Sequence, residues 1–189
     1  MEYKKEFQQG IDGIIVTNLG HNVEYCAMIN ILVKEFQGAK LQKHNLYFVG
    51  NGGSAAIAIH MTSDYLKNGG ICTHSMHDPA TITCLGNDFG YEYIFSKQLE
   101  MVAGEGDILV AISSSGNSLN ILNAVYAAKK KGCTVVTFSG FEENNKLRSL
   151  GDYNIYVPSI RYGIVESIHN MILQQIVDEI VGLDGIGMK

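Results

Sequence analysis

The 189-residue sequence has no tryptophan, only two prolines and four cysteines. It also lacks any run approaching the ~20 consecutive apolar residues that a membrane helix needs, so no membrane partner is expected. The cysteines, at positions 26, 72, 84 and 133, are far apart and form no C-x-x-C pair. Neither a disulfide framework nor a zinc knuckle is therefore indicated. No apolar segment follows the charged first residues, so we expect no secretory signal and a cytoplasmic protein.

Positive charge is scarce and scattered, and the formal net charge is −5. The single basic run, Lys129-Lys130-Lys131, stands near the expected end of a helix, where cations interact favourably with the helix dipole. Nucleic-acid binding needs a broader basic face. We therefore expect no nucleic-acid partner.

Two segments rich in serine and glycine, VGNGGSA at 49–55 and ISSSGNS at 112–118, each follow an apolar run and precede a helical pattern. Glycine lets the backbone approach an anion closely, and the first N–H groups of a helix lack partners and lie at the positive end of its dipole. Serine hydroxyls add neutral donors. The segments thus predict a phosphorylated small-molecule ligand. Its candidate contacts are Asn51, Gly52, Gly53, Ser54, Ser113, Ser114, Ser115, Asn117 and Ser118.

Short β-like runs alternate with helical patterns along the chain, which is typical of a parallel sheet with helices on both faces. The expected strands are 46–49, 71–74, 108–112, 134–138 and 155–157, and the expected helices are 18–36, 55–66, 91–102, 119–131 and 162–181. We therefore predict a single α/β domain over 1–189, with an N-terminal helical segment at about 1–40, a core at about 41–182 and a frayed tail at 183–189. Ligands of such sheets bind at the carboxyl ends of the strands, where both serine-rich segments lie.

The last helix has isoleucines spaced by four that are expected to pack inward, and a polar stripe of Glu166, Asn170 and Gln174 with His169 beside it. Such a stripe is often simply solvated. In a helix this rich in isoleucine, it is alternatively a face turned toward a site or a subunit interface.

Three motifs carry a family resemblance: GNGGSA at 50–55, LGNDFGY at 85–91, and EGDIL at 105–109 running into SSSGNS at 113–118. In this order and spacing, the chain resembles the sugar isomerase (SIS) domain family, and within it the phosphoheptose isomerases. The resemblance implies a flavodoxin-like three-layer sandwich with a five-stranded parallel sheet. It also implies a homotetramer with sites between subunits, in which the N-terminal helix takes part in oligomerisation.

The activity implied is interconversion of a ketose phosphate and an aldose phosphate, here sedoheptulose 7-phosphate and a heptose 7-phosphate for surface-polysaccharide precursors. Such a reaction needs a base that moves a proton between C1 and C2, and an acid or a metal, zinc by resemblance, that acts on the carbonyl oxygens. By the same resemblance Ser54, Ser113, Ser115 and Ser118 bind the phosphate.

The metal and catalytic positions of the family align with His60, Asp64, Glu166 and Gln174. The family has Glu, Gln and His at the last three of these positions, so the acid–base half of the site differs while the phosphate half is intact. The four residues still form an N/O set for a divalent ion, with Asp64 or Glu166 as the base. From their i, i+4 spacing alone, His60 and Asp64 are either metal ligands or a structural polar pair.

Two further candidates each have a plainer alternative. His169 is a second candidate acid or base, or else a packed, hydrogen-bonded histidine. Asp88 borders the sugar by resemblance, or else it caps a turn or the next helix.

Two functions follow from these residues. The first is a phosphosugar isomerase. The alternative is a non-catalytic SIS module that binds a phosphosugar or a protein partner, and it is raised by Gln174, which stands where the family has its catalytic histidine.

Overall fold

The computed structural model describes residues 2–182 and is built around a seven-stranded sheet in the order β2-β1-β7-β6-β5-β3-β4. The strands are β1 (Ile15–Asn18), β2 (His21–Val23), β3 (Leu46–Gly50), β4 (Thr73–Ser75), β5 (Ile108–Ser113), β6 (Thr134–Ser139) and β7 (Tyr153–Tyr156). The five from β7 to β4 are parallel and correspond to the five predicted strands. The tail at 183–189 lies outside the described residues.

The two additional strands, β1 and β2, form an antiparallel hairpin beside β7. The prediction of a helix from residue 18 was wrong at its start, since the helix begins at Tyr25 and runs to Gln42. Leu19 and Gly20 at the tip of the hairpin both have positive φ, 47° and 82°. Two such residues make the tight turn that joins antiparallel strands, but leucine seldom adopts this conformation, so the turn had no clear sequence signal.

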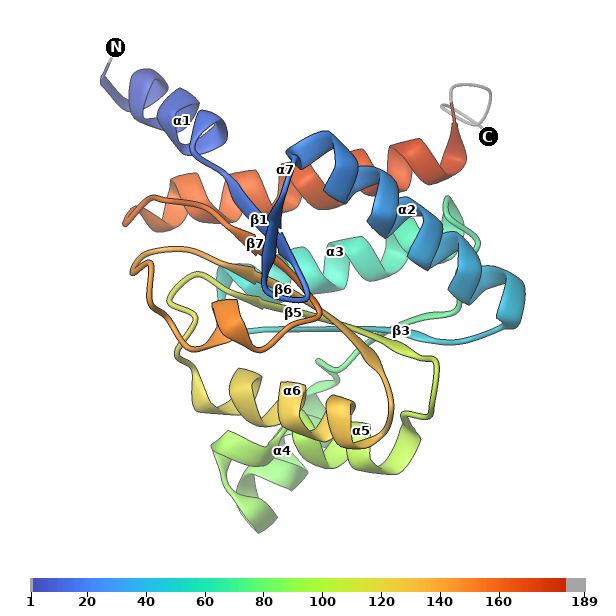
Figure 1. The fold of residues 1–189 in the computed structure, drawn as a ribbon. Coiled ribbons are helices and arrows are strands. Elements are labelled where there is room, and N and C mark those ends of the chain that lie inside the picture. Colours follow the sequence, from blue (N-terminus) through green and yellow to red (C-terminus); the bar gives the residue numbers. More distant parts are fainter. Residues whose placement is uncertain (1, 183–189) are drawn as a thin grey trace.

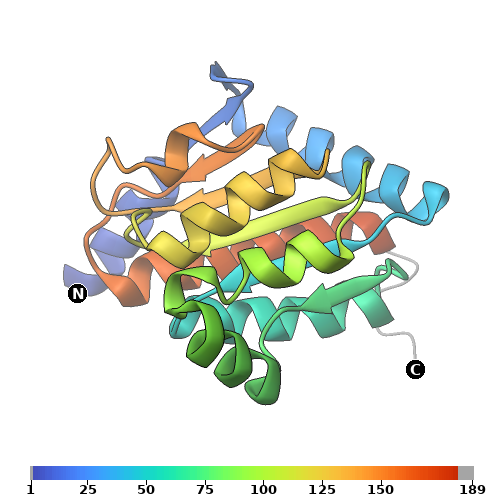
Figure 2. The same cartoon turned by 90° about the horizontal axis from the view of Figure 1, so that it is seen from below.

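The helices form two layers that cover the two faces of the sheet (Figure 1). One layer contains α1 (Glu2–Asp12), α2 (Tyr25–Gln42), α3 (Gly53–Lys67) and α7 (Tyr162–Val181). The other contains α4 (Pro79–Phe89), α5 (Ser96–Val102) and α6 (Leu119–Lys130), which are nearest the viewer in Figure 2. Short 3₁₀ turns, η1 (Tyr91–Tyr93) and η2 (Leu147–Ser149), complete the chain. The expected three-layer sandwich is thus present.

Helix α4 was not predicted, although its start follows a standard pattern. Asp78 accepts a hydrogen bond from the Thr81 backbone N–H, and Pro79 occupies the first helical turn. The segment was interpreted as a turn because Gly86, Asn87 and Asp88 have low helix propensity.

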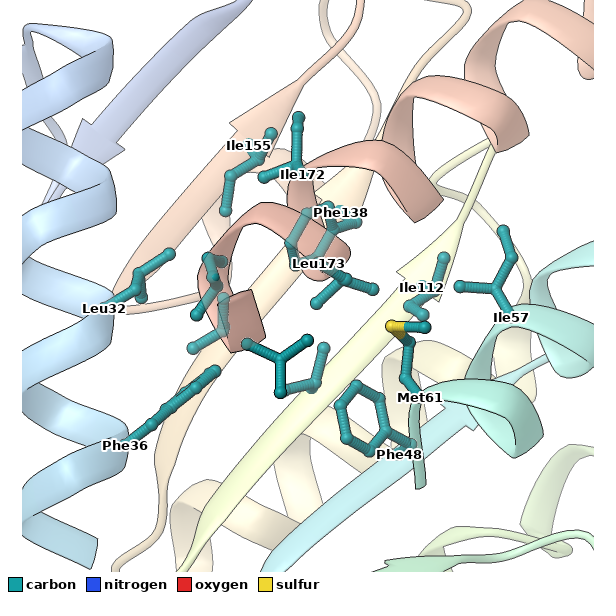
Figure 3. Packing of buried hydrophobic residues seen from close by; sticks show 14 of the residues in the cluster. Leu32, Phe36, Phe48, Ile57, Met61, Ile112, Phe138, Ile155, Ile172 and Leu173 are labelled. Carbon is teal, nitrogen blue, oxygen red and sulfur yellow. The ribbon is translucent and has the colours of Figure 1, made fainter. Parts of the chain in front are cut away.

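Apolar side chains pack on both faces of the sheet. The larger cluster joins the sheet to α2, α3 and α7. Figure 3 shows part of it, with Leu32, Met61 and Leu173 from these helices and Phe48 and Phe138 from the strands. This packing holds α3 and α7 side by side, and the two helices carry the polar residues of the candidate site. Among residues 2–182, no helix combines the length and the apolar character needed to cross a membrane.

Candidate active site

The two serine-rich loops meet at the carboxyl ends of β3 and β5, which are neighbouring parallel strands. There they border a cavity of about 410 Å³. The cavity is lined by Asn51, Gly52, Gly53, Ser54, Ser113, Ser114, Ser115, Ser118, Tyr162 and Glu166. The structure thus brings together all the predicted phosphate contacts except Asn117.

Hydrogen-bond donors at this cavity are left without partners. Neither α3 nor α6 has a side chain that caps its first turn, and Gly52 and Ser118 occupy the two N-cap positions. Their first N–H groups are therefore free for an anion. The Ser114 hydroxyl is buried and has no hydrogen-bond partner among the described residues. A buried polar atom without a partner is unfavourable, so a ligand with acceptor oxygens fits this cavity.

The first loop is held in place by a side-chain amide pair. Asn51 Nδ2 donates to Asn120 Oδ1 at 2.9 Å, and Asn120 Nδ2 donates back to Asn51 Oδ1 at 2.8 Å. The Tyr91 hydroxyl also donates to Asn51 Oδ1 at 3.1 Å. Asn120 is buried on the first turn of α6, so the pair connects the first loop to the helix that follows the second.

The second loop is supported by the segment after β6. Gly116 has φ of 62° and packs so closely on the Asn145 side chain that a β-carbon would clash with Asn145 Oδ1. Asn117 does not line the cavity. Its amide instead bonds to the Ser115 carbonyl at 3.1 Å and to the Lys146 N–H at 3.2 Å. The prediction of Asn117 as a ligand contact is therefore corrected to a role in shaping the loop.

Glu166 is the only charged residue of the cavity lining. Its carboxylate lies against the first residue of α3, where a β-carbon on Gly53 would clash with it. Partial burial raises the pKa of this carboxyl above its usual value. Among residues 2–182, neither Lys nor Arg lines the cavity, so the donors that it offers a phosphate are backbone N–H groups and hydroxyls.

A second polar cluster lies further along α3 and α7. Gln174 Nε2 donates to Asp64 Oδ2 at 2.7 Å and contacts His60 Nε2 at 3.1 Å, and His60 Nε2 is 3.4 Å from Asp64 Oδ2. Because of the bond to Asp64, the NH₂ group of the Gln174 amide faces Asp64 and His60. His60 Nε2 is then an acceptor, so a neutral His60 carries its proton on Nδ1.

The predicted four-residue metal group is not assembled, because Glu166 lies eight residues before Gln174 on α7. Eight residues of helix rise by about 12 Å. Within residues 2–182, no three His, Cys, Asp or Glu side chains are grouped to hold a metal. The remaining set of one imidazole, one carboxylate and one amide does fit a divalent ion in donor type. His60 Nε2 and Asp64 Oδ2 are 3.4 Å apart, close to the ~3.3 Å between tetrahedral ligands at about 2.0 Å from zinc.

His169 lies in the core rather than in the cavity. It is fully buried, its Nε2 donates to the Ser139 carbonyl at 3.0 Å, and its ring packs edge-on against Phe138. Burial lowers the pKa of His169 to about 4. The packed alternative therefore describes His169 better than an acid–base role, which would need access to the ligand.

Asp88 is exposed near the end of α4, where it accepts a hydrogen bond from Asn87 at 2.9 Å. It is not among the residues that line the cavity, and its position beside the sugar stays a prediction. Tyr162 was missed in the sequence, although it precedes Glu166 by one helical turn and lines the same cavity. That i, i+4 spacing was the available signal.

Comparison with known proteins places this geometry in a family. The SIS domain model matches residues 22–140. Phosphoheptose isomerase from Glaesserella parasuis is 36% identical over 87% of this chain and 86% of its own length. The enzyme of that name from Cytophaga hutchinsonii is 40% identical over 68% and 70%.

Solved structures agree with the sequence relatives. A phosphoheptose isomerase structure from Francisella tularensis is similar with a TM-score of 0.82 and 27% identity, covering 95% of this chain and 94% of that one. The structure from Neisseria gonorrhoeae has a TM-score of 0.76 and 28% identity, covering 82% and 86%. The chain belongs to the SIS domain family, among the phosphoheptose isomerases.

Proposed function

We propose that this protein is an aldose–ketose isomerase that interconverts sedoheptulose 7-phosphate and a heptose 7-phosphate. The observation that carries the proposal is the pairing of two clusters along one pair of helices. Uncapped helix starts and serine hydroxyls at one end suit a phosphate. The other cluster lies two turns or more further along α3 and α7 and suits the reacting end of an extended sugar chain. It consists of His60, Asp64 and Gln174.

In this proposal Asp64 is the base. Its Oδ2 atom takes the proton from C1 or C2 and returns it to the neighbouring carbon through an enediol. The hydrogen bond from Gln174 orients this carboxylate. Glu166, the other predicted base, lies at the phosphate end and is too far along the helix to share this task.

His60, Asp64 and Gln174 are the residues that would hold a divalent ion, once the Gln174 amide presents its carbonyl oxygen. When bound, a zinc ion would polarise the substrate carbonyl. Without the ion, the Gln174 amide orients Asp64, and His60 and Gln174 provide hydrogen bonds to the C1 and C2 oxygens.

Cytoplasmic location, a role in surface-polysaccharide precursors and a homotetramer with sites between subunits belong to the same proposal. Exposed apolar side chains on α2 and α3, Leu41, Ile59 and Leu66, support association with further copies. The N-terminal segment, which contains α1, would take part in the contact between subunits.

The test is proton exchange in D₂O. Sedoheptulose 7-phosphate is incubated with the protein, with and without Zn²⁺, and NMR follows deuterium entering C1 and the appearance of aldose. We expect exchange that Asp64→Asn lowers at least about a hundredfold, within the range for losing a general base. Asp178→Asn, an exposed change on α7, is the matched control. Binding of the sugar phosphate without exchange would contradict the isomerase and favour the binding-module alternative.

A further inference from the structure

The short connection between β4 and α4 carries a histidine that belongs to neither polar cluster of the site. His77 follows the three-residue edge strand β4 and precedes Asp78, the cap of α4. Its Nε2 atom lies 2.9 Å from the carbonyl oxygen of Gly50, the last residue of β3. A carbonyl oxygen only accepts hydrogen bonds, so His77 Nε2 carries the proton and donates this one.

This imidazole takes the place of a backbone bond between the two strands. Just before it, the Met76 N–H donates to the Phe48 carbonyl at 3.4 Å. Carbonyls alternate in direction along a strand, so the Gly50 carbonyl, two residues further on, faces the same side as that of Phe48. The chain has by then turned into α4 at Pro79, which has no N–H to offer. The His77 side chain thus supplies the donor that a longer edge strand would supply from its backbone.

The surroundings of His77 hold its ring in one orientation and one tautomer. The Ser75 hydroxyl lies 3.3 Å from Nδ1 and donates to it. The ring also packs edge-on against Phe95, with the two centroids 5.2 Å apart. Partial burial lowers the pKa of His77, so the ring is neutral at pH 8.

The bonded carbonyl belongs to the peptide unit from which the first serine loop starts. Gly50 is packed so closely under the first turn of α3 that a β-carbon would clash with the Ser54 carbonyl. Because the peptide unit is planar, a fixed Gly50 carbonyl also fixes the plane from which Asn51 leaves the strand. We propose that His77 is a positioning residue that holds the first phosphate loop in its binding conformation from the edge of the sheet. This inference rests on the proposed function, since it takes that loop to bind the phosphate.

Substitutions at position 77 separate the donor from the packing of the ring. His77→Phe keeps a ring against Phe95 but removes the donor. At pH 8 it should raise both the Kd for glycerol 3-phosphate, measured by calorimetric titration, and the KM for sedoheptulose 7-phosphate about tenfold, as expected for one lost hydrogen bond. The kcat should change less than twofold, because Asp64 lies further along α3. His77→Gln, whose amide again offers an N–H, should recover most of the affinity.

His74→Ala is the matched control, because it removes an exposed imidazole of β4 that contacts Cys72 and Asn45 rather than the loop. It should leave the Kd and the KM unchanged. Wild-type affinity in His77→Phe, or no recovery in His77→Gln, would overturn the positioning role while the phosphate site stands. A fall in kcat as large as the rise in KM would overturn it too.

The wild-type protein provides a second test that depends on no variant. A long-range ¹H–¹⁵N spectrum at pH 8 should show His77 protonated on Nε2, with a shift of this signal when glycerol 3-phosphate binds. A ring protonated on Nδ1 would overturn the proposal. Binding of sugar phosphates without turnover would contradict the isomerase and leave the Kd values to decide the role of His77. Failure of wild-type protein to bind either phosphate would overturn the proposed function as well.

Discussion

At the scale of single residues, His169 shows how a polar side chain can serve the site without touching the ligand. Its Nε2 atom bonds to the carbonyl of Ser139 at the end of β6. The next residue, Gly140, donates its N–H to the Ser114 carbonyl in the second serine loop. His169 thus anchors a strand end that holds a phosphate loop, and it does so as a neutral imidazole.

Folding stability should therefore depend on the protonation of His169. Its pKa is about 4 in the folded protein, against about 6.5 in an unfolded chain. Since the unfolded state binds the proton more tightly, the contribution is complete above pH 6.5 and is lost as the pH falls toward 4. Between pH 7 and 5, wild-type protein should lose about 2 kcal/mol more than His169→Gln, which keeps a donor but does not titrate.

Urea unfolding at fixed protein concentration measures this difference. His21→Gln, at an exposed histidine of the hairpin, should show the wild-type pH dependence. Parallel pH profiles for wild type and His169→Gln would show that His169 is not buried as a neutral group.

At the scale of elements, the amide pair of Asn51 and Asn120 predicts coupling between the phosphate loops. Either alanine variant leaves one amide of the pair unsatisfied, at a cost of about 1–3 kcal/mol. Because the pair positions the first loop, Asn120→Ala should weaken binding of glycerol 3-phosphate about tenfold. It should raise KM far more than it lowers kcat.

A double-mutant cycle tests that coupling. Asn51→Ala combined with Asn120→Ala should bind no more weakly than the worse single variant. Asn123→Ala, on the same helix and outside the pair, should bind as wild type does. Additive losses would mean that the two asparagines act independently.

The elements also show why sequence predicts some features and not others. The five parallel strands and the serine loops could be predicted because apolar runs ending in Gly and Ser are local patterns. The hairpin could not, because its turn places Leu19 in a conformation that leucine rarely adopts. Both loops were expected at the carboxyl ends of strands, and they lie there. The Asn51–Asn120 pair depends on strand order, which a single sequence does not show.

The separation of Glu166 from Gln174 was available in the sequence. Positions eight apart on a helix are about 80° apart around its axis as well as about 12 Å along it. The family resemblance groups Glu166 and Gln174 with His60 and Asp64, whereas the helix geometry separates Glu166 from Gln174. The structure places Glu166 in the cavity of the serine loops, and Gln174 beside Asp64 on α3.

At the scale of the whole molecule, the distance between the cavity and the cluster at His60 should select the length of the substrate. Gly53 and His60 are seven residues apart on α3, a rise of about 10 Å. A sugar phosphate held by the serine loops must span this distance to bring C1 and C2 to His60, whose Nε2 atom is 3.4 Å from Asp64 Oδ2. A pentose 5-phosphate is two carbons shorter than a heptose 7-phosphate, so it cannot occupy both ends at once.

Sedoheptulose 7-phosphate should therefore exceed ribulose 5-phosphate in kcat/KM by a factor of about a hundred or more, as expected when positioning at the base is lost. The two ketose phosphates should bind with similar affinity, because the phosphate contacts are common to both. The difference should thus appear in kcat, measured by the same NMR exchange assay at saturating substrate. Equal kcat values for both sugars would mean that the phosphate and the base are brought together by another route, such as a base supplied from a neighbouring copy of the chain.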